Sequence, residues 1–347
     1  MCMNGLSKHI ISALALFVLV SFSGCIDDDG FNDSPVGNFD ALWSVMDQRY
    51  CFFSYKNVDW DEVYSRYRPL VNDNTGEYEL FDIMSAMLNE LKDGHVNLVS
   101  TFNQSRYWEW FEAYPQNFSE EIVKRYYLKQ PDYKIAGGFD YRILEGTQIG
   151  YMYFGNFSSA VSDGNLNEIL LSFVGCKGII IDVRDNGGGL LTNVDKIVSR
   201  FITGDMTYAY IRHKLSPAHD DFSDYYPMSI KAAPDGYVKY YGPIAVLTNR
   251  SCYSATNSFV AAMKLLPQVA VFGDKTGGGS GLPFSSQLPN GWNVRFSASP
   301  MSDTDYKDIE GGIEPTFKVD MEPIEAGLTR DNIIDAAVDW INSGALR

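Results

Sequence analysis

The sequence is poor in basic residues and has few histidines and cysteines, and no long hydrophobic run lies beyond its N-terminus. It holds 28 Lys and Arg against 44 Asp and Glu, which gives a net charge of −16. This balance argues against nucleic-acid binding, which needs a basic face. The absence of a long internal apolar run predicts that no segment after the N-terminus spans a membrane. Hydrophobic residues still make up 45% of the chain, which is typical of a well-packed globular protein.

The cysteines are few and show no paired spacing. After the N-terminal apolar segment they are Cys25, Cys51, Cys176 and Cys252. This pattern predicts neither a disulfide framework nor a zinc site. Cys252 lies two residues before Ser254, and we interpret it as a small packing residue, with a cysteine nucleophile as the open alternative.

The N-terminus has the features of a signal peptide over residues 1–24. Lys8 precedes an apolar stretch from Ile10 to Phe22, which is short for a membrane span and suited to a signal-peptide core. The stretch ends in Phe22-Ser23-Gly24-Cys25, which resembles a bacterial lipobox. We therefore expect Cys25 to carry a lipid, residues 25–37 to form a tether, and the protein to be anchored in the bacterial cell envelope, facing the periplasm or the cell surface. An ordinary cleaved signal peptide is the alternative.

Residues 38–98 are predicted to form an N-terminal helical domain. Apolar residues recur there at helical spacing in three stretches. The second stretch opens with Asp59-Trp60-Asp61-Glu62, a capping box. The third ends at Lys92-Asp93-Gly94, so that its last helix delivers His95.

After an aromatic-rich connector at residues 99–140, the chain alternates predicted strands and helices from 141 to 347. The expected strands are 149–154, 179–183, 244–247, 269–272, 293–297 and 317–319, and the expected helices are 193–202, 255–266 and 331–342. This alternation indicates an α/β domain.

Two segments of this domain carry chemistry. The predicted strand from Ile179 to Val183 has the apolar pattern of burial on both faces and runs into Gly187-Gly188-Gly189, whose backbone N–H groups can hold a developing oxyanion. A simple tight turn is the alternative. The strand from Ile244 is followed by Ser254 at the start of an apolar helix, where an α/β enzyme places a nucleophile and where a serine can also be only an N-cap.

Five segments occur in the order found in the C-terminal-processing (tail-specific) serine peptidases, which the chain therefore resembles. They are Leu91-Lys92-Asp93-Gly94-His95, Asp182-Val183-Arg184-Asp185-Asn186-Gly187-Gly188-Gly189, Ser254-Ala255, Gly273-Asp274-Lys275-Thr276-Gly277-Gly278 and Gly312-Ile313-Glu314-Pro315. The resemblance implies a crotonase-like (ClpP/crotonase) α/β catalytic domain, and the N-terminal helices resemble those of bacterial lipoprotein members. The stretch from Val99 to Ile149, about 50 residues, is too short for the PDZ domain of the processing peptidases.

The chain departs from the processing peptidases at their catalytic lysine, whose position is Gly279 here. Lys275 lies nearby but matches a different position. The resemblance to the tricorn-core branch, which uses Ser, His and Glu, then implies His95 as the base and Glu310 as the carboxylate that orients it, with Asp308 as a rival. His213 and His219, the other histidines beyond the N-terminal segment, lie in a charged stretch that we expect to be a surface loop.

The resemblance thus implies a secreted, lipid-anchored serine endopeptidase acting on proteins or peptides, with Ser254, His95 and Glu310 as its triad. Gly188 and Ala255 would supply the oxyanion hole, and no metal or cofactor is expected. Two alternatives stay open. One is a catalytically inactive protein on the same scaffold that binds a peptide, glycan or lipid, and the other is a Ser–Lys enzyme that uses Lys275.

Overall fold

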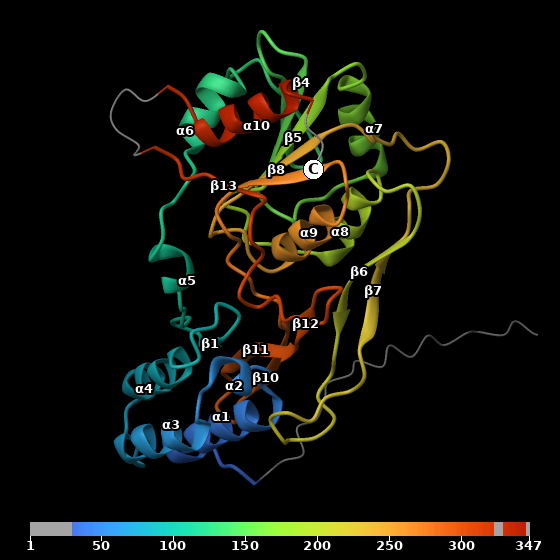
Figure 1. Ribbon diagram of the computed structural model, residues 1–347. Helices are drawn as coiled ribbons and strands as arrows, with labels where there is room; N and C mark the ends of the chain where they lie inside the picture. The colour runs from blue at the N-terminus through green and yellow to red at the C-terminus, as the bar shows by residue number, and fades with distance from the viewer. Residues whose placement is uncertain (1–29, 323–328, 345–347) are drawn as a thin grey trace, which may run out of the picture. The chain divides into compact units, whose positions relative to one another are not determined.

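A seven-stranded mixed sheet forms the centre of the computed structural model, which describes residues 30–322 and 329–344 (Figure 1). The strands lie in the order β13 (Phe317–Lys318), β9 (Val269–Gly273), β8 (Ile244–Thr248), β5 (Gly178–Asp182), β4 (Ile149–Phe154), β3 (Phe139–Ile143) and β2 (Lys134–Ala136). The pairs from β13 to β4 are parallel, whereas β3 and β2 extend the sheet antiparallel. The predicted α/β class is confirmed.

The central strands are buried on both faces, as their continuous apolar runs predicted. In β5, Ile179 and Ile181 pack into one core and Ile180 into the other, because successive side chains of a strand point to opposite faces. The first core holds helices α7 (Asp163–Ser172), α8 (Leu191–Val198) and α9 (Ala255–Lys264), and the second holds α6 (Glu120–Ile122), η2 (Val123–Tyr127) and α10 (Asn332–Asn342). Figure 1 shows α10 and α6 across the sheet from α7, α8 and α9.

The N-terminal helices form a second region with its own core. They are α1 (Pro35–Arg49), α2 (Phe53–Lys56), α3 (Trp60–Tyr67), η1 (Arg68–Leu70) and α4 (Glu77–Asn89). One half of the predicted capping box of α3 is confirmed: the Asp59 side chain accepts a hydrogen bond from the Glu62 N–H at 3.0 Å, while among the described residues no return bond joins the Glu62 side chain to the Asp59 N–H. This core also includes Val294 and Phe296, which come from far along the chain. The boundary at residue 98 stays a prediction.

Two smaller sheets complete the described fold. One has the order β1 (Asn97–Val99), β11 (Asn293–Ser299) and β10 (Leu282–Gln287), and the other β12 (Met301–Ser302), β6 (Met206–Ile211) and β7 (Tyr226–Ile230). The connector after β1 contains α5 (Glu109–Glu112) and then α6, η2, β2 and β3, so its last part joins the central sheet.

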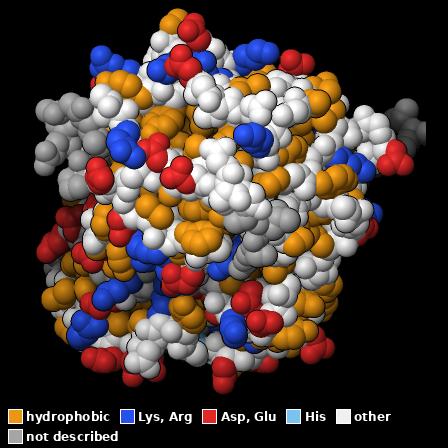
Figure 2. Space-filling view, turned by 45° about the horizontal axis from the view of Figure 1, so that its top comes forward, with side chains coloured by type: hydrophobic (Ala, Val, Ile, Leu, Met, Phe, Trp, Pro, Cys, Tyr) orange, Lys and Arg blue, Asp and Glu red, His pale blue; other side chains and the backbone are white. Residues whose placement is uncertain are grey.

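Acidic and basic side chains are interspersed on the face shown in Figure 2, with hydrophobic side chains between them. Within residues 30–322 and 329–344, none of the helices has the length and apolar character needed to cross a membrane. The predicted signal peptide, Cys25 and residues 26–29 of the predicted tether lie outside the described residues, whereas residues 30–37 of that tether are described and helix α1 begins within them, at Pro35.

Candidate active site

Ser254 and His95 lie in hydrogen-bond contact, although 159 residues separate them in the sequence. The distance from Ser254 Oγ to His95 Nε2 is 3.0 Å. Ser254 stands between β8 and α9 with φ 58° and ψ −120°, a backbone conformation that is strained for a residue with a side chain. Its side chain does not cap α9, so the N-cap alternative does not account for its hydroxyl. A strained strand-to-helix turn that exposes a serine is typical of nucleophiles in α/β hydrolases.

Hydrogen bonds to two neighbouring loops, one at Gly278 and one at Asn186, hold the backbone around Ser254. The Ser254 N–H donates to the Gly278 carbonyl at 2.9 Å, and the Tyr253 N–H donates to the Asn186 carbonyl at 3.1 Å. Asn186 Oδ1 accepts from the Thr256 hydroxyl at 2.8 Å and from the Gly188 N–H at 2.9 Å. Asn186 therefore ties the glycine turn to the first turn of α9.

The predicted oxyanion donors, Gly188 and Ala255, lie side by side. A Cβ added to Gly188, whose φ is +101°, would stand 2.9 Å from the Ala255 nitrogen and 2.8 Å from Ser254 Cβ, so only glycine fits there. The Gly188 N–H, however, is occupied by Asn186. The next residue, Gly189, lines the cavity beside Ser254 and forms a parallel β-bridge with Phe157. Phe157 bonds the Gly188 carbonyl and the Leu190 N–H, so the N–H of Gly189 itself points away from Phe157. Both predicted donors stay predictions, and Gly189 is a competing donor.

His95 is buried, with 3% of its surface exposed. Burial lowers the pKa of His95 to about 4, against the opposing effect of Asp93, and the charges of Arg295 and Lys56 lower it further. The neutral ring that results is the form that can accept a proton at pH 7. His95 Nδ1 has no hydrogen-bond partner among the described residues, while the nearby Gly281 carbonyl favours the protonated ring.

Asp93 is the carboxylate that the sequence reasoning missed. Its Oδ1 accepts from the His95 backbone N–H at 2.8 Å and from the Tyr253 hydroxyl at 3.3 Å, and its Oδ2 accepts from Tyr50 at 3.0 Å and Ser297 at 2.9 Å. Burial alone would raise the pKa of Asp93, but the charge of Lys56 and these hydrogen bonds hold it below its ordinary value. An ionised Asp93 fixes the turn that presents His95 and favours positive charge on its ring.

Glu310 is buried near this cluster but makes other contacts. Its Oε2 accepts from the Ser280 N–H at 2.8 Å, and its Oε1 lies 3.3 Å from Lys56 Nζ. Burial and the neighbouring Asp93 raise the pKa of Glu310 to about 8. In the described part of the chain no hydrogen bond joins Glu310 to His95. Asp308, the rival carboxylate, instead accepts from the Glu310 N–H at 2.7 Å.

The Tyr253 ring leaves no room for a lysine side chain at position 279. A Cβ on Gly279 would lie 2.4 Å from the Tyr253 ring, whose centroid is 4.9 Å from that of His95. Tyr253 therefore fills the space next to the nucleophile that a side chain at 279 would need. Lys275 is engaged elsewhere, 3.1 Å from Glu314.

The remaining nucleophile and base candidates are also engaged. Cys252 is fully buried, its thiol donates to the Val183 carbonyl at 3.0 Å, and burial raises its pKa, which fits the predicted packing role. His213 contacts Ser299 and His219 contacts Asp47, at 3.0 and 2.8 Å.

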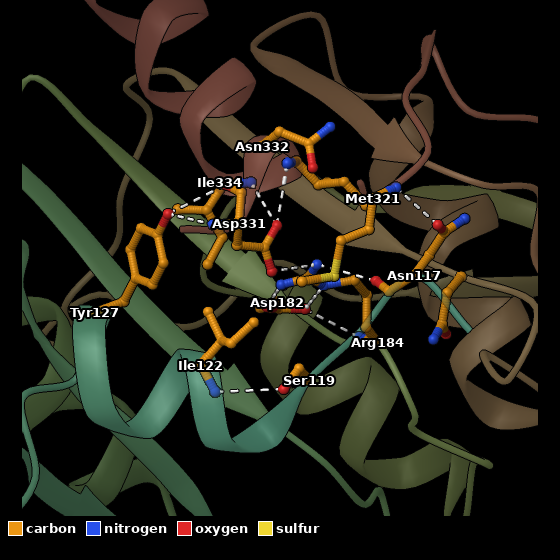
Figure 3. Close-up of polar contacts among 12 residues, drawn as sticks. Asn117, Ser119, Ile122, Tyr127, Asp182, Arg184, Met321, Asp331, Asn332 and Ile334 are labelled. Atoms are coloured by element: carbon orange, nitrogen blue, oxygen red, sulfur yellow. Dashed lines mark hydrogen bonds and ion pairs between the residues drawn. The ribbon is translucent and has the colours of Figure 1, made fainter. Parts of the chain in front are cut away.

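A buried ion network holds the strand that leads into the glycine turn (Figure 3). Arg184 Nη2 lies 2.6 Å from Asp182 Oδ2, and Nη1 lies 2.8 Å from Asp331 Oδ2. Asp331 also caps α10, because its Oδ1 accepts from the Ile333 N–H at 3.0 Å. The network thus joins the end of β5 to the helix that covers the far face of the sheet.

Ser254 and His95 open onto a cavity of about 280 Å³. Most of its wall is apolar and comes from α8, α9, β10 and the residue that begins β12. The lining includes Leu190, Leu191, Leu282, Pro283 and Met301, together with Arg295. A cavity of this size beside a nucleophile suits one side chain of a bound substrate.

Two protein families match the chain. Peptidase family S41 matches residues 148–319, and the tricorn protease C1 domain matches residues 32–89. A putative peptidase from Parabacteroides merdae ATCC 43184, known from its crystal structure, is 50% identical with a TM-score of 0.85, over 91% of this chain and 100% of that one.

Curated relatives are more distant. The carboxy-terminal processing protease CtpB of Bacillus subtilis (strain 168) is 25% identical over 51% of this chain and 35% of its own length. A probable CtpA-like serine protease of Staphylococcus aureus (strain N315) is 26% identical over 57% and 36% respectively. The matches thus span about a third of the length of these two relatives.

Proposed function

Because the chain belongs to peptidase family S41, a family of C-terminal processing proteases, we propose that it is a serine peptidase in which Ser254 is the nucleophile and His95 the general base. The observation that carries this proposal is the 3.0 Å hydrogen bond from Ser254 Oγ to His95 Nε2. Proteins or peptides are the substrates, and the cleavage mode is endopeptidase. The catalytic domain is crotonase-like in this proposal, in agreement with its α/β architecture.

The reaction uses the geometry of the site directly. His95 Nε2 takes the proton of Ser254 as the hydroxyl oxygen attacks the peptide carbonyl carbon, and the resulting oxyanion is held by the Ala255 N–H and an N–H of the glycine turn. His95 then gives the proton to the leaving amine, and water hydrolyses the acyl-enzyme by the same steps. The imidazolium formed on the way is stabilised by the buried negative charge of Asp93.

We keep Glu310 as the proposed third member of a Ser–His–Glu triad, and add Asp93 as a positioning residue. Glu310 contacts Ser280, next to the Gly281 carbonyl that faces the His95 ring. Asp93 acts on His95 through its backbone and its charge. The Glu310→Gln and Asp93→Asn variants separate the two roles.

The test is labelling with a fluorophosphonate probe, which reacts with activated serines, together with cleavage of a casein-derived peptide mixture. Ser254→Ala should abolish both, with a loss of several orders of magnitude in kcat/KM and a nearly unchanged Tm. Ser251→Ala, three residues away in the same turn, is the matched control and should label and cleave like the native protein. A fully active Ser254→Ala variant would remove Ser254 as the nucleophile.

The lipid anchor on Cys25 and the place in the bacterial cell envelope belong to this proposal as well. They rest on the lipobox-like Phe22-Ser23-Gly24-Cys25. The alternative of a non-catalytic binding protein is not favoured, since packing alone does not require a strained serine in contact with a neutral buried histidine.

A further inference from the structure

Arg295 is a half-buried cation that lines the cavity of Ser254 and His95. Within residues 30–322 and 329–344 its guanidinium has neither an ion pair nor a hydrogen bond to a side chain. The charge of Asp93 acts on Arg295, but the Asp93 oxygens already accept hydrogen bonds from Tyr50, Ser297, Tyr253 and the His95 N–H. Arginines in such surroundings are usually paired, because a buried charge without a counter-ion loses its hydration.

The strand pattern explains why this charge faces the cavity. Val294 and Phe296 of β11 pack into the core of the N-terminal helices, so Arg295 and Ser297 point to the opposite face. Ser297 reaches Asp93 on that face. The partners directly across from Arg295 are Asn97 on β1 and Ser285 on β10, neither of which is acidic. The neighbouring strands therefore supply no negative charge at this register.

In the free enzyme, the unpaired charge of Arg295 is unfavourable both for Arg295 itself and for protonation of His95. Burial lowers the pKa of Arg295, and the positive charge of Arg295 contributes to the low pKa of His95. An anion bound at Arg295 would offset both effects, since it would replace the lost hydration and ease the protonation of His95 during catalysis. The rest of the cavity wall is mainly apolar. Among the described residues that line this cavity, Arg295 is the one lysine or arginine.

We propose that Arg295 binds a carboxylate of the peptide substrate next to the scissile bond, and so sets a preference for anionic peptides. This inference rests on the proposed peptidase function. A guanidinium can hold a carboxylate through two parallel hydrogen bonds, which favours this group over a neutral amide. The carboxylate is either the free C-terminus of a short leaving peptide or an Asp or Glu side chain, and the two are separated by the substrates used.

The experiment starts from a peptide that the native enzyme cleaves and Ser254→Ala does not, selected from a proteome-derived peptide library by mass spectrometry. Versions of that peptide differ only in one group. One pair ends in a carboxylate or a carboxamide, and other pairs carry Glu or Gln at each position flanking the cleaved bond. The measured quantity is the ratio of kcat/KM for the acid over that for the amide.

For at least one pair, the ratio should exceed one in the native enzyme and fall about 10- to 100-fold in Arg295→Gln, the range for a charge-assisted hydrogen bond. Arg295→Lys should keep part of the preference. Arg49→Gln is the matched control, because Arg49 bonds Ser286 on the same sheet without lining the cavity, and its ratio should equal the native one.

The outcomes separate the two proposals. Peptides cleaved by the native enzyme with the same acid-to-amide ratios in Arg295→Gln overturn the role of Arg295 and leave the peptidase function standing. If no library peptide is cleaved in a Ser254-dependent way, the peptidase function falls, and the role of Arg295 falls with it. If Arg295→Gln fails to fold, the test uses the native enzyme alone. Peptides with the carboxylate should then slow its fluorophosphonate labelling at lower concentrations than the matching amide peptides. Equal inhibitory concentrations for acid and amide would contradict the inference.

Discussion

The acid limb of the pH–rate profile should lie near pH 4 and not near pH 6.5, the ordinary histidine value. The reason is the burial of His95, which lowers its pKa to about 4 in the free enzyme. The profile of kcat/KM reports the free enzyme's essential base. At pH 5 a base with a pKa of 4 is about 90% neutral, whereas one with a pKa of 6.5 is about 3% neutral. The two cases therefore differ by roughly 30-fold in kcat/KM at that pH.

The assay measures kcat/KM on one uncharged peptide between about pH 3.5 and about pH 8 at constant ionic strength, a range that brackets both histidine values. The imidazole pKa can be measured independently by NMR in Ser254→Ala, because the sequence has only 4 histidines and His95→Gln assigns the signal. An acid limb at about 6.5, matched by the NMR titration, would refute the burial argument. A limb that persists in an active His95→Ala variant and vanishes in Lys275→Ala would replace His95 by Lys275 as the base.

The same pKa fixes the sign of a stability effect. A histidine whose folded pKa lies below 6.5 binds fewer protons in the folded than in the unfolded state, so its contribution is present above pH 6.5 and is lost as pH falls through 4. The full loss is about 3 kcal/mol. It appears as the difference in the free energy of unfolding between the native protein and His95→Gln, measured with urea across this window. Glu310, whose pKa is raised to about 8, has the opposite effect: its contribution to the free energy of unfolding is lost as pH rises through 8. Because the native protein and His95→Gln both contain Glu310, this effect cancels in the difference between them.

Three further outcomes are expected. Asp93→Asn should lower kcat/KM more than Glu310→Gln when both variants are assayed at pH 7 on one peptide. The reason is that Asp93 is ionised and bonds the His95 turn, whereas Glu310, with a pKa of about 8, is mostly protonated at that pH. The reverse order would favour Glu310 as the residue that supports His95. Arg184→Met should cost about 3–5 kcal/mol in urea unfolding, since two buried carboxylates lose their cation, and a loss below about 1 kcal/mol would contradict that role. Cys25→Ser should move the expressed protein from the membrane fraction to the soluble fraction, because a lipid chain contributes about 0.8 kcal/mol per buried methylene, and unchanged fractionation would refute the lipid anchor.

The elements that local pattern controls were predictable from the sequence. The apolar runs of β5 and β8 signal strands buried on both faces, and both are. Asp59 signals the start of α3, which begins at Trp60. In each case the sequence signal itself lies within a few consecutive residues, so that composition and periodicity carry the information.

The contacts between distant segments were not predictable in that way. The bond between His95 and Ser254 was expected only through the resemblance to a family, because no periodicity relates residues 159 positions apart. The pairing of β1 with β11 places Arg295 in the cavity, and nothing near Arg295 in the sequence indicates that pairing. Asp93 stood in the quoted Lys92-Asp93-Gly94-His95 segment, yet an Asp before a Gly also fits an ordinary turn. Its four hydrogen bonds come from Tyr50, Tyr253, Ser297 and His95, so only the folded chain shows its role.

These distant contacts make the catalytic pair a junction between two hydrophobic cores. His95 lies between Leu91 and Val96, which belong to the core of the N-terminal helices, while Ser254 lies between Cys252 and Ala255, which belong to the core of the central sheet. A hydrogen bond of 3.0 Å across this junction tolerates little relative movement of the two cores. Asp93 restricts that movement, because its two oxygens accept from Tyr50 on the helical side and from Tyr253 next to Ser254. Loss of Asp93 would therefore loosen the pair even where each core keeps its own packing, which is why its variant is expected to affect activity more than overall stability.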